Sequence, residues 1–181
     1  MNAARMLSIT AGLAACLAMP FGARADATLA EADEALSALR KADPGLKTFL
    51  DHAAGYAVFP SVAKGGLVVG GAGGSGVLFE NGKAVGKTTL SQVTVGAQVG
   101  GQAYYEIIFF ETAETLAAFK KGEWTMAAQV SAVALKSGAS ADAKYTEGVA
   151  VFTLAKGGAM AEASVGGQKF SYEPLTPAKK K

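Results

Sequence analysis

Residues 55–83 read GYAVFPSVAKGGLVVGGAGGSGVLFENGK, and this stretch decides the fold. Glycine is costly to order in a helix or a strand, because its unfolded backbone is so free. Short β-prone runs such as 56–59 and 77–79 separate the glycines, and the second leads into Asn81-Gly82, a strong hairpin signal. We therefore predict strands that pack too closely for side chains. The glycines expected to permit this packing are Gly65, Gly66, Gly70, Gly71, Gly74 and Gly76.

Two glycine patterns here resemble nucleotide-binding motifs, but each lacks the required context. Residues 71–76 satisfy G-x-G-x-x-G, yet a dinucleotide site needs a helix whose N-terminal amides face the pyrophosphate, and a strand and hairpin follow instead. Residues 86–88 resemble the end of a phosphate-binding loop, but the first glycine of that motif would fall on Asn81. We interpret both patterns as structural.

The sequence of residues 55–66 is similar to that of residues 148–158. Both segments contain G-x-A-V-F followed by A-K-G-G, in the same order after one single-residue gap. Chance is one explanation in a chain rich in alanine and glycine. The shared order favours a quasi-repeat, with the two copies as neighbouring strands of one sheet system.

The first 25 residues have the composition of a signal peptide. Arg5 precedes an apolar run at residues 6–18, Pro20 breaks it, and residues 23–25 read Ala-Arg-Ala, a small-x-small cleavage site. We therefore expect an exported protein, periplasmic or secreted, whose mature chain starts near Asp26. The apolar run is too short for a retained membrane span.

Cys16 is the single cysteine of the chain and lies inside this leader. It closes Leu-Ala-Ala-Cys, which resembles a lipoprotein processing site, but the apolar run continues past it to a good cleavage site. Simple cleavage is favoured over lipidation, so the mature chain has no thiol for a disulfide or a metal. The leader also holds two basic and no acidic residues, which leaves equal numbers of each sign. This balance argues against a nucleic-acid partner.

We predict an α+β fold with one β-rich domain, formed by a curved antiparallel sheet or a barrel-like sandwich of about seven strands. N-terminal helices are expected to cover it, the first over 26–41 and the second capped by Asp43. One short helix, capped by Thr112 and stopped by Gly122, should follow the central strand. The expected division is 1–25 signal peptide, 26–54 helical segment, 55–173 glycine-rich β domain and 174–181 basic tail.

Residues 103–110 are apolar on both sides and are therefore placed at the heart of the sheet. Residues 124–133 read as a weak strand, with a helix as the alternative because of their alanines. The remaining strands are expected at 147–154, 159–165 and 169–172.

The residues for catalysis or metal binding are scarce. His52 is the single imidazole, and its place near the end of a helix favours a structural role. Without cysteine in the mature chain, a transition-metal site is not expected. Glu106 lies inside the most apolar strand, where exposure on one face is expected and a buried carboxyl with a raised pKa is the alternative. We therefore expect neither an enzyme nor a cofactor.

The ordered glycine motifs resemble the SYLF domain, also called the yeast-type actin-binding or lipid-binding domain. The resemblance covers about residues 46–172. Its motifs are GYAVFP at 55–60, KGG at 64–66, the glycines at 70–76, QVGGQ at 98–102 and the glycine pair at 157–158.

This resemblance implies binding of phosphoinositides or phospholipids and, in fungal members, binding and bundling of actin, with no enzymatic activity. Because an exported protein does not meet cytoplasmic actin, we carry over lipid binding at a membrane surface. The alternative is a structural or protein-interaction module of the cell envelope. By charge and turn position, the expected lipid contacts are Lys64, Lys83 and Lys87, followed by Lys120 and Lys121, and solubilising turn lysines are the competing interpretation.

Overall fold

The computed structural model describes residues 26–66, 69–95, 100–122, 124–126, 130–156 and 167–175. The predicted signal peptide, the strand expected at 159–165 and most of the basic tail lie outside these residues.

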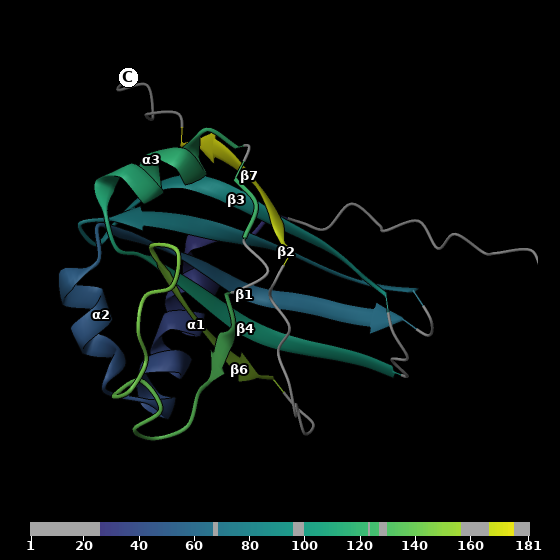
Figure 1. The fold of residues 1–181 in the computed structure, drawn as a ribbon, viewed down its shortest axis with the longest axis horizontal. Coiled ribbons are helices and arrows are strands. Elements are labelled where there is room, and N and C mark those ends of the chain that lie inside the picture. Colours follow the sequence, from purple (N-terminus) through teal and green to yellow (C-terminus); the bar gives the residue numbers. More distant parts are fainter. Residues whose placement is uncertain are drawn as a thin grey trace, which may run out of the picture.

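Three helices and seven strands make up the described fold (Figure 1). In chain order they are α1 (Leu29–Ala42), α2 (Leu46–His52), β1 (Gly55–Gly66), β2 (Val69–Glu80), β3 (Lys83–Val95), β4 (Gly100–Phe110), α3 (Ala113–Lys120), β5 (Ala132–Ala134), β6 (Val149–Ala155) and β7 (Lys169–Pro174).

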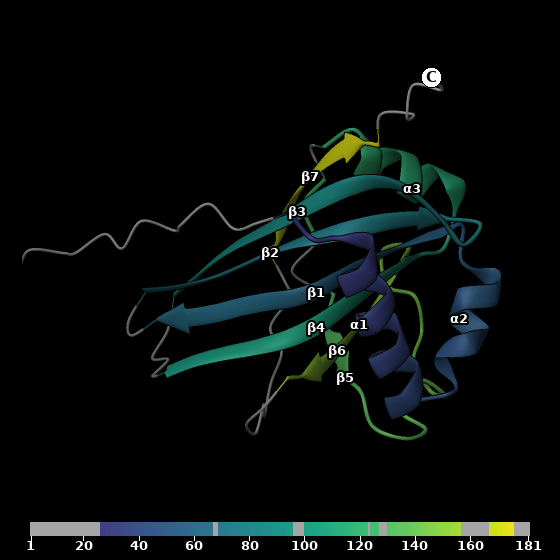
Figure 2. The ribbon, with the colours of Figure 1, turned by 180° about the vertical axis from the view of Figure 1, so that it is seen from behind.

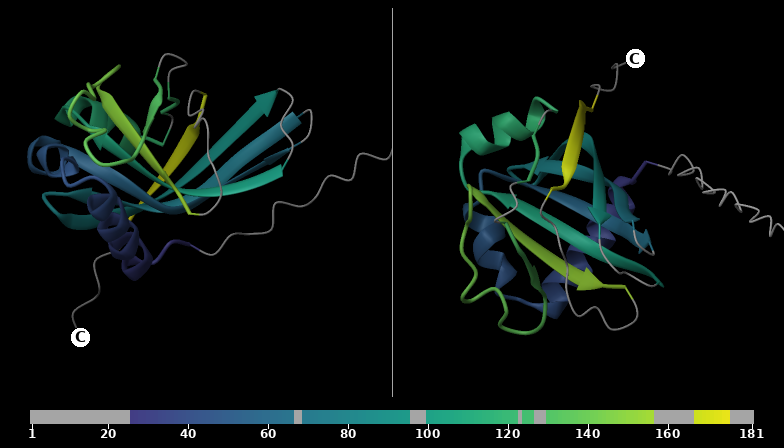
Figure 3. Two further views of the ribbon diagram at one scale, coloured as in Figure 1. Left: turned by 90° about the horizontal axis from the view of Figure 1, so that it is seen from below. Right: turned by 45° about the vertical axis from the view of Figure 1, so that its right-hand side comes forward.

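The strands form one curved, open sheet in the order β5-β6-β4-β1-β2-β3-β7 (Figure 3). Every neighbouring pair is antiparallel except β5 and β6, which are parallel. The predicted α+β class is confirmed, with N-terminal helices and one short helix after β4. The sheet does not close into a barrel.

The glycine-rich stretch forms two long strands rather than several short ones. β1 pairs along its length with β2 on one side and β4 on the other, so ladder hydrogen bonds hold glycines that would be weak in an isolated strand. The register shifts beside Pro60, which has no N–H to donate. Asn81 and Gly82 have φ values of 50° and 72°, as a two-residue hairpin requires, so the predicted turn is confirmed.

The two copies of the quasi-repeat lie in the same sheet but are not neighbours. They form β1 and β6, and β4 separates them. Ile108 at the centre of β4 pairs with Ala57 of β1 and with Val151 of β6. The central position predicted for residues 103–110 is therefore confirmed, whereas direct pairing of the copies was wrong.

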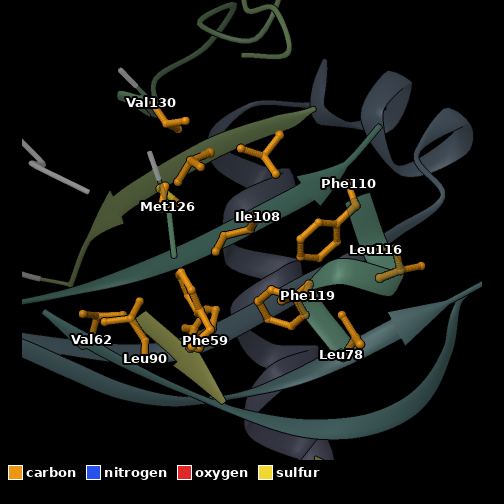
Figure 4. Packing of buried hydrophobic residues seen from close by; sticks show 14 of the residues in the cluster. Phe59, Val62, Leu78, Leu90, Ile108, Phe110, Leu116, Phe119, Met126 and Val130 are labelled. Carbon is orange, nitrogen blue, oxygen red and sulfur yellow. The ribbon is translucent and has the colours of Figure 1, made fainter. Parts of the chain in front are cut away.

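Both faces of the sheet are buried at the end that carries the β2–β3 hairpin. On one face, Ile107 and Phe109 pack in the cluster that includes α1 and α2 (Figure 2). On the other, Ile108 and Phe110 pack with Phe119 of α3 (Figure 4). β4 is apolar on both sides because each side meets a separate helical layer.

Residues 124–133 differ from their prediction as a continuous strand or helix. In the described part of this segment, Thr125 forms an isolated bridge with Lys169, and only its end enters β5. Met126 and Val130 instead point their side chains into the concave core of the sheet (Figure 4). Burial of these side chains outweighs the weak strand pattern.

The helix ends show which capping predictions the local sequence supports. Thr112 caps α3 through a bond from the Thr115 amide, as predicted, and Gly122 follows α3 with a φ of 75°. The first helix begins later than expected, at Leu29, because Thr28 forms a capping box with Glu31. The bonds from Thr28 lower the pKa of Glu31.

Asp43 was expected to cap α2, but it holds a distant loop instead. Its carboxylate accepts bonds from the backbone amides of Gly45 at 3.0 Å and Ser140 at 2.7 Å. Burial opposes ionisation of Asp43, but these backbone bonds outweigh it and lower its pKa.

We expect Asp43→Ala to lower the free energy of unfolding by about 1–3 kcal/mol at pH 7, because the buried amide of Ser140 loses its acceptor. A lowered carboxyl pKa stabilises the fold above the unfolded value and loses this effect as the pH falls, so the difference from the unaltered protein should shrink at pH 3. Urea unfolding at both pH values measures it. Asp142→Ala, an exposed change nearby, is the control, and an equal loss there would contradict the assignment.

Candidate functional site

The five predicted lipid-binding lysines do not form one patch. Lys64 lies in β1 opposite Ala72 and Gln102, towards the end of the sheet away from the β2–β3 hairpin. The other four lie at the hairpin end. Lys83 and Lys121 are exposed there, whereas Lys120 forms an ion pair with Glu80.

The predicted structural glycines fall into two groups. Gly65 pairs with Gly71 and Gly66 with Gly70 where β1 and β2 end. Gly74 and Gly76 lie deeper. A Cβ at Gly74 would lie 2.8 Å from the Ser61 carbonyl oxygen. A side chain at Gly74 would therefore collide with the backbone of the neighbouring strand β1.

Lys87 lies in a groove, called here the Lys87 groove, between the chain segment that enters α1 and strands β2, β3 and β7. The groove has two adjoining parts, with volumes of about 380 and 210 Å³. Asp26, Ala27 and Lys87 line both parts. Gly76, another predicted residue, lines the larger one.

The larger part has a row of hydroxyl groups along its floor. Ser75 of β2, Thr89 of β3 and Ser171 of β7 are directly opposite one another in register, so their side chains share one face of the sheet. Thr89 Oγ1 and Ser171 Oγ are 2.5 Å apart and hydrogen-bonded. The floor therefore offers both donors and acceptors to a ligand.

The charged side chains that line the larger part are one lysine, Lys87, and two carboxylates, Asp26 and Glu173. Lys87 Nζ lies 2.7 Å from a carboxylate oxygen of Asp26. The bond and charge of Asp26, with a smaller contribution from Glu173, raise the pKa of Lys87. Both partners of the pair are well exposed, so it adds little to stability and can exchange with a ligand.

The smaller part has a mostly apolar lining beside Asp26, Thr28 and Lys87. Leu29 at the start of α1 and Leu175 after β7 line it, with exposed fractions of 49% and 37%. Val77 and Ala27 complete its apolar lining. Two exposed leucines thus adjoin a polar pocket, so the Lys87 groove has one polar and one mainly apolar part.

A second groove lies between α1 and α2 and has a volume of about 550 Å³. Arg40, Lys41 and Lys47 line it together with Asp33. Lys47 pairs with Asp51 at 2.5 Å. Sequence reasoning missed this groove, because its lining depends on where α2 lies relative to α1.

Glu106 is fully buried, so its expected exposure was wrong. One bond to it is described, from Gln168 Nε2 to Oε2 at 3.1 Å, and burial raises its pKa to about 8. Tyr104 and Thr153 lie beside it on β4 and on the paired β6, and all three are buried. This internal cluster is separate from the Lys87 groove.

The other residues that could take part in catalysis or metal binding do not cluster into a site in the described part of the chain. His52 is exposed, and its Nδ1 lies 2.7 Å from the Thr48 carbonyl oxygen, to which it can donate within α2. Among the described residues, no three histidine, cysteine, aspartate or glutamate side chains are grouped to hold a metal. None of the described helices has the length and apolar character needed to cross a membrane.

Comparison with known proteins agrees with the resemblance to the SYLF domain over the second half of the chain. Residues 91–174, from β3 to the end of β7, match the family model described as Ysc84, Las17-binding protein actin regulator. Beta cell expansion factor A of Aeromonas veronii is 33% identical over 142 residues, which are 77% of this chain and 53% of that protein. The chain thus spans about half the length of this curated relative. Residues 91–174 of this chain are thus similar to the Ysc84 (SYLF) domain family.

Proposed function

We propose that this protein is an exported, non-catalytic domain that binds lipid at the cell envelope. The match of residues 91–174 to the SYLF family supports a domain that binds lipid or protein. The observation that carries the choice of lipid is the Lys87 groove, in which a polar pocket adjoins an apolar one lined by exposed leucines.

An amphiphile satisfies both parts of the groove at once. Its alkyl portion would cover Leu29 and Leu175 and remove apolar surface from water. Its headgroup would meet Lys87 and the hydroxyl row. A purely polar ligand would leave the leucines in water, and a purely apolar one would leave the polar groups without partners.

We expect the double variant Leu29→Ala, Leu175→Ala to bind lipid vesicles about tenfold or more weakly. Each substitution removes most of the apolar side-chain area that the bound lipid would cover. Co-sedimentation of the full chain with vesicles of zwitterionic and anionic phospholipid measures this. Val93→Ala is the matched control, because Val93 is 79% exposed and lies outside the groove.

Two outcomes would contradict the proposal. Absence of binding to either kind of vesicle at low salt would exclude lipid binding, and an equal loss in Val93→Ala would exclude the groove. A melting curve for each variant shows whether the fold is retained.

A protein-interaction module is the second candidate. It is favoured by the end of the sheet away from the helices, where β3 exposes Val93 and β4 exposes Gly101 (Figure 2). The matched family is also described as a Las17-binding actin regulator. Capture of one stoichiometric envelope protein, with no vesicle binding, would favour this function over lipid binding.

A further inference from the structure

We propose that the polar part of the Lys87 groove takes an uncharged, hydroxyl-rich headgroup, of the kind carried by a glycosyl diacylglycerol, rather than a phosphate. This inference rests on the proposed function and names the class of lipid that the groove selects.

The charges in the groove disfavour an anion. Lys87 is its one cation among the lining residues, and Asp26 already neutralises it at 2.7 Å. Glu173 lies opposite Lys87 in register and adds a further carboxylate. A phosphate that paired with Lys87 would have to displace the carboxylate of Asp26, and it would still face the carboxylate of Glu173.

The same groups suit a ligand that both donates and accepts hydrogen bonds. A sugar hydroxyl can donate to Asp26 and accept from the neighbouring ammonium of Lys87 without separating them. A phosphate diester has no proton to donate to the carboxylates of Asp26 and Glu173. The adjacent cation and carboxylates therefore match alcohol groups better than phosphate oxygens.

The hydroxyl row extends this match over several groups. Ser75, Thr89 and Ser171 lie on adjacent strands, so the row spans about 10 Å at the usual strand spacing. The bond between Thr89 and Ser171 uses one proton and one lone pair, which leaves a free O–H on one of the two side chains and lone pairs on both. A ring that carries several hydroxyls can contact the row at more than one place.

The apolar part fixes the direction of the ligand. Leu29 and Leu175 line the part that adjoins Asp26 and Lys87, so an alkyl chain there places the headgroup over the hydroxyl row. A free sugar would gain only the polar contacts. We therefore infer a lipid with a glycosyl headgroup rather than a soluble saccharide.

Vesicles of phosphatidylcholine, alone or with an equal fraction of monoglycosyl diacylglycerol or of phosphatidylglycerol, test this inference with the full chain. We expect the glycosyl lipid to increase binding by about tenfold, with little dependence on salt, and phosphatidylglycerol to give no comparable increase. A preference for phosphatidylglycerol that salt abolishes would overturn the headgroup inference and leave lipid binding intact. Failure to bind any vesicle would overturn the proposed function and this inference together.

The double variant Thr89→Val, Ser171→Ala should lose the preference for the glycosyl lipid. Binding to vesicles that contain this lipid should weaken by about tenfold, because two hydroxyls that bond the headgroup are removed. Ser91→Ala is the matched control, because Ser91 is an exposed hydroxyl two residues further along β3 and outside the groove. Retention of the preference in the double variant, with an unchanged melting temperature, would also overturn the inference.

Discussion

Glu106→Gln is expected to raise the free energy of unfolding at pH 9 by about 3–5 kcal/mol. Burial raises the pKa of Glu106 from 4.5 to about 8, so at pH 9 the folded protein must bury a carboxylate charge that the unfolded chain leaves in water. Each pKa unit corresponds to about 1.4 kcal/mol. The change is expected to stabilise the protein because glutamine has the same shape and no charge to bury.

The direction of the pH effect follows from proton counting. Between about pH 4.5 and 8 the folded state binds more protons than the unfolded state at Glu106, so the contribution of this residue to stability falls as the pH rises. Glu106→Gln should remove this decline, and the two proteins should differ least near pH 4.

The surroundings of Glu106 explain why glutamine fits. Glu106 Oε1 and Gln168 Oε1 are both buried without a hydrogen-bond partner in the described part of the chain. A proton on Glu106 supplies a donor for this pair, and so does the amide of glutamine. Each also allows Oε2, or its equivalent, to keep the bond from Gln168 Nε2.

Urea unfolding from pH 4 to pH 9 measures the effect. Glu111→Gln is the control, because Glu111 follows the same strand and is exposed. The assignment of Glu106 as a buried, neutral acid would be wrong if Glu106→Gln kept the pH dependence of the unaltered protein. It would also be wrong if this variant were less stable than the unaltered protein at pH 9.

Gly76→Val is expected to lower the free energy of unfolding by about 3 kcal/mol, and to prevent folding if the protein is only marginally stable. A Cβ at Gly76 would lie 2.7 Å from both Phe59 Cδ1 and the Val58 carbonyl oxygen. The ring could shift, but the carbonyl belongs to the β1 backbone and is held in the sheet.

Gly101→Val is the matched control for this experiment. It lies in β4 of the same sheet, and the nearest atom to its Cβ, within 4 Å, is the Lys64 carbonyl oxygen at 3.9 Å. The melting temperatures of both variants should therefore show whether close packing at Gly76 causes the loss of stability, or whether this sheet tolerates no added side chain at any glycine. Equal melting temperatures for Gly76→Val and the unaltered protein would contradict the packing account of the glycines.

The sequence by itself determined the features that depend on neighbouring residues. Asn81-Gly82 formed the predicted hairpin because its positive φ values are local preferences. Thr112 capped α3 because a cap needs a side chain only three residues from its amide. Residues 103–110 of β4 are apolar on both sides, which predicted the central place of this strand, and the ordered glycine motifs indicated the family.

Tertiary structure decided the features that join distant segments. Glu106 is buried and accepts a hydrogen bond from Gln168, which is 62 residues away in the chain, so periodicity within β4 could not show its surroundings. The Lys87 groove combines Asp26 and Leu29 with residues of β2, β3 and β7, so no local motif marks it. Lys64 is separated from the other predicted lysines because long antiparallel strands carry residues that are close in sequence to opposite ends of the sheet.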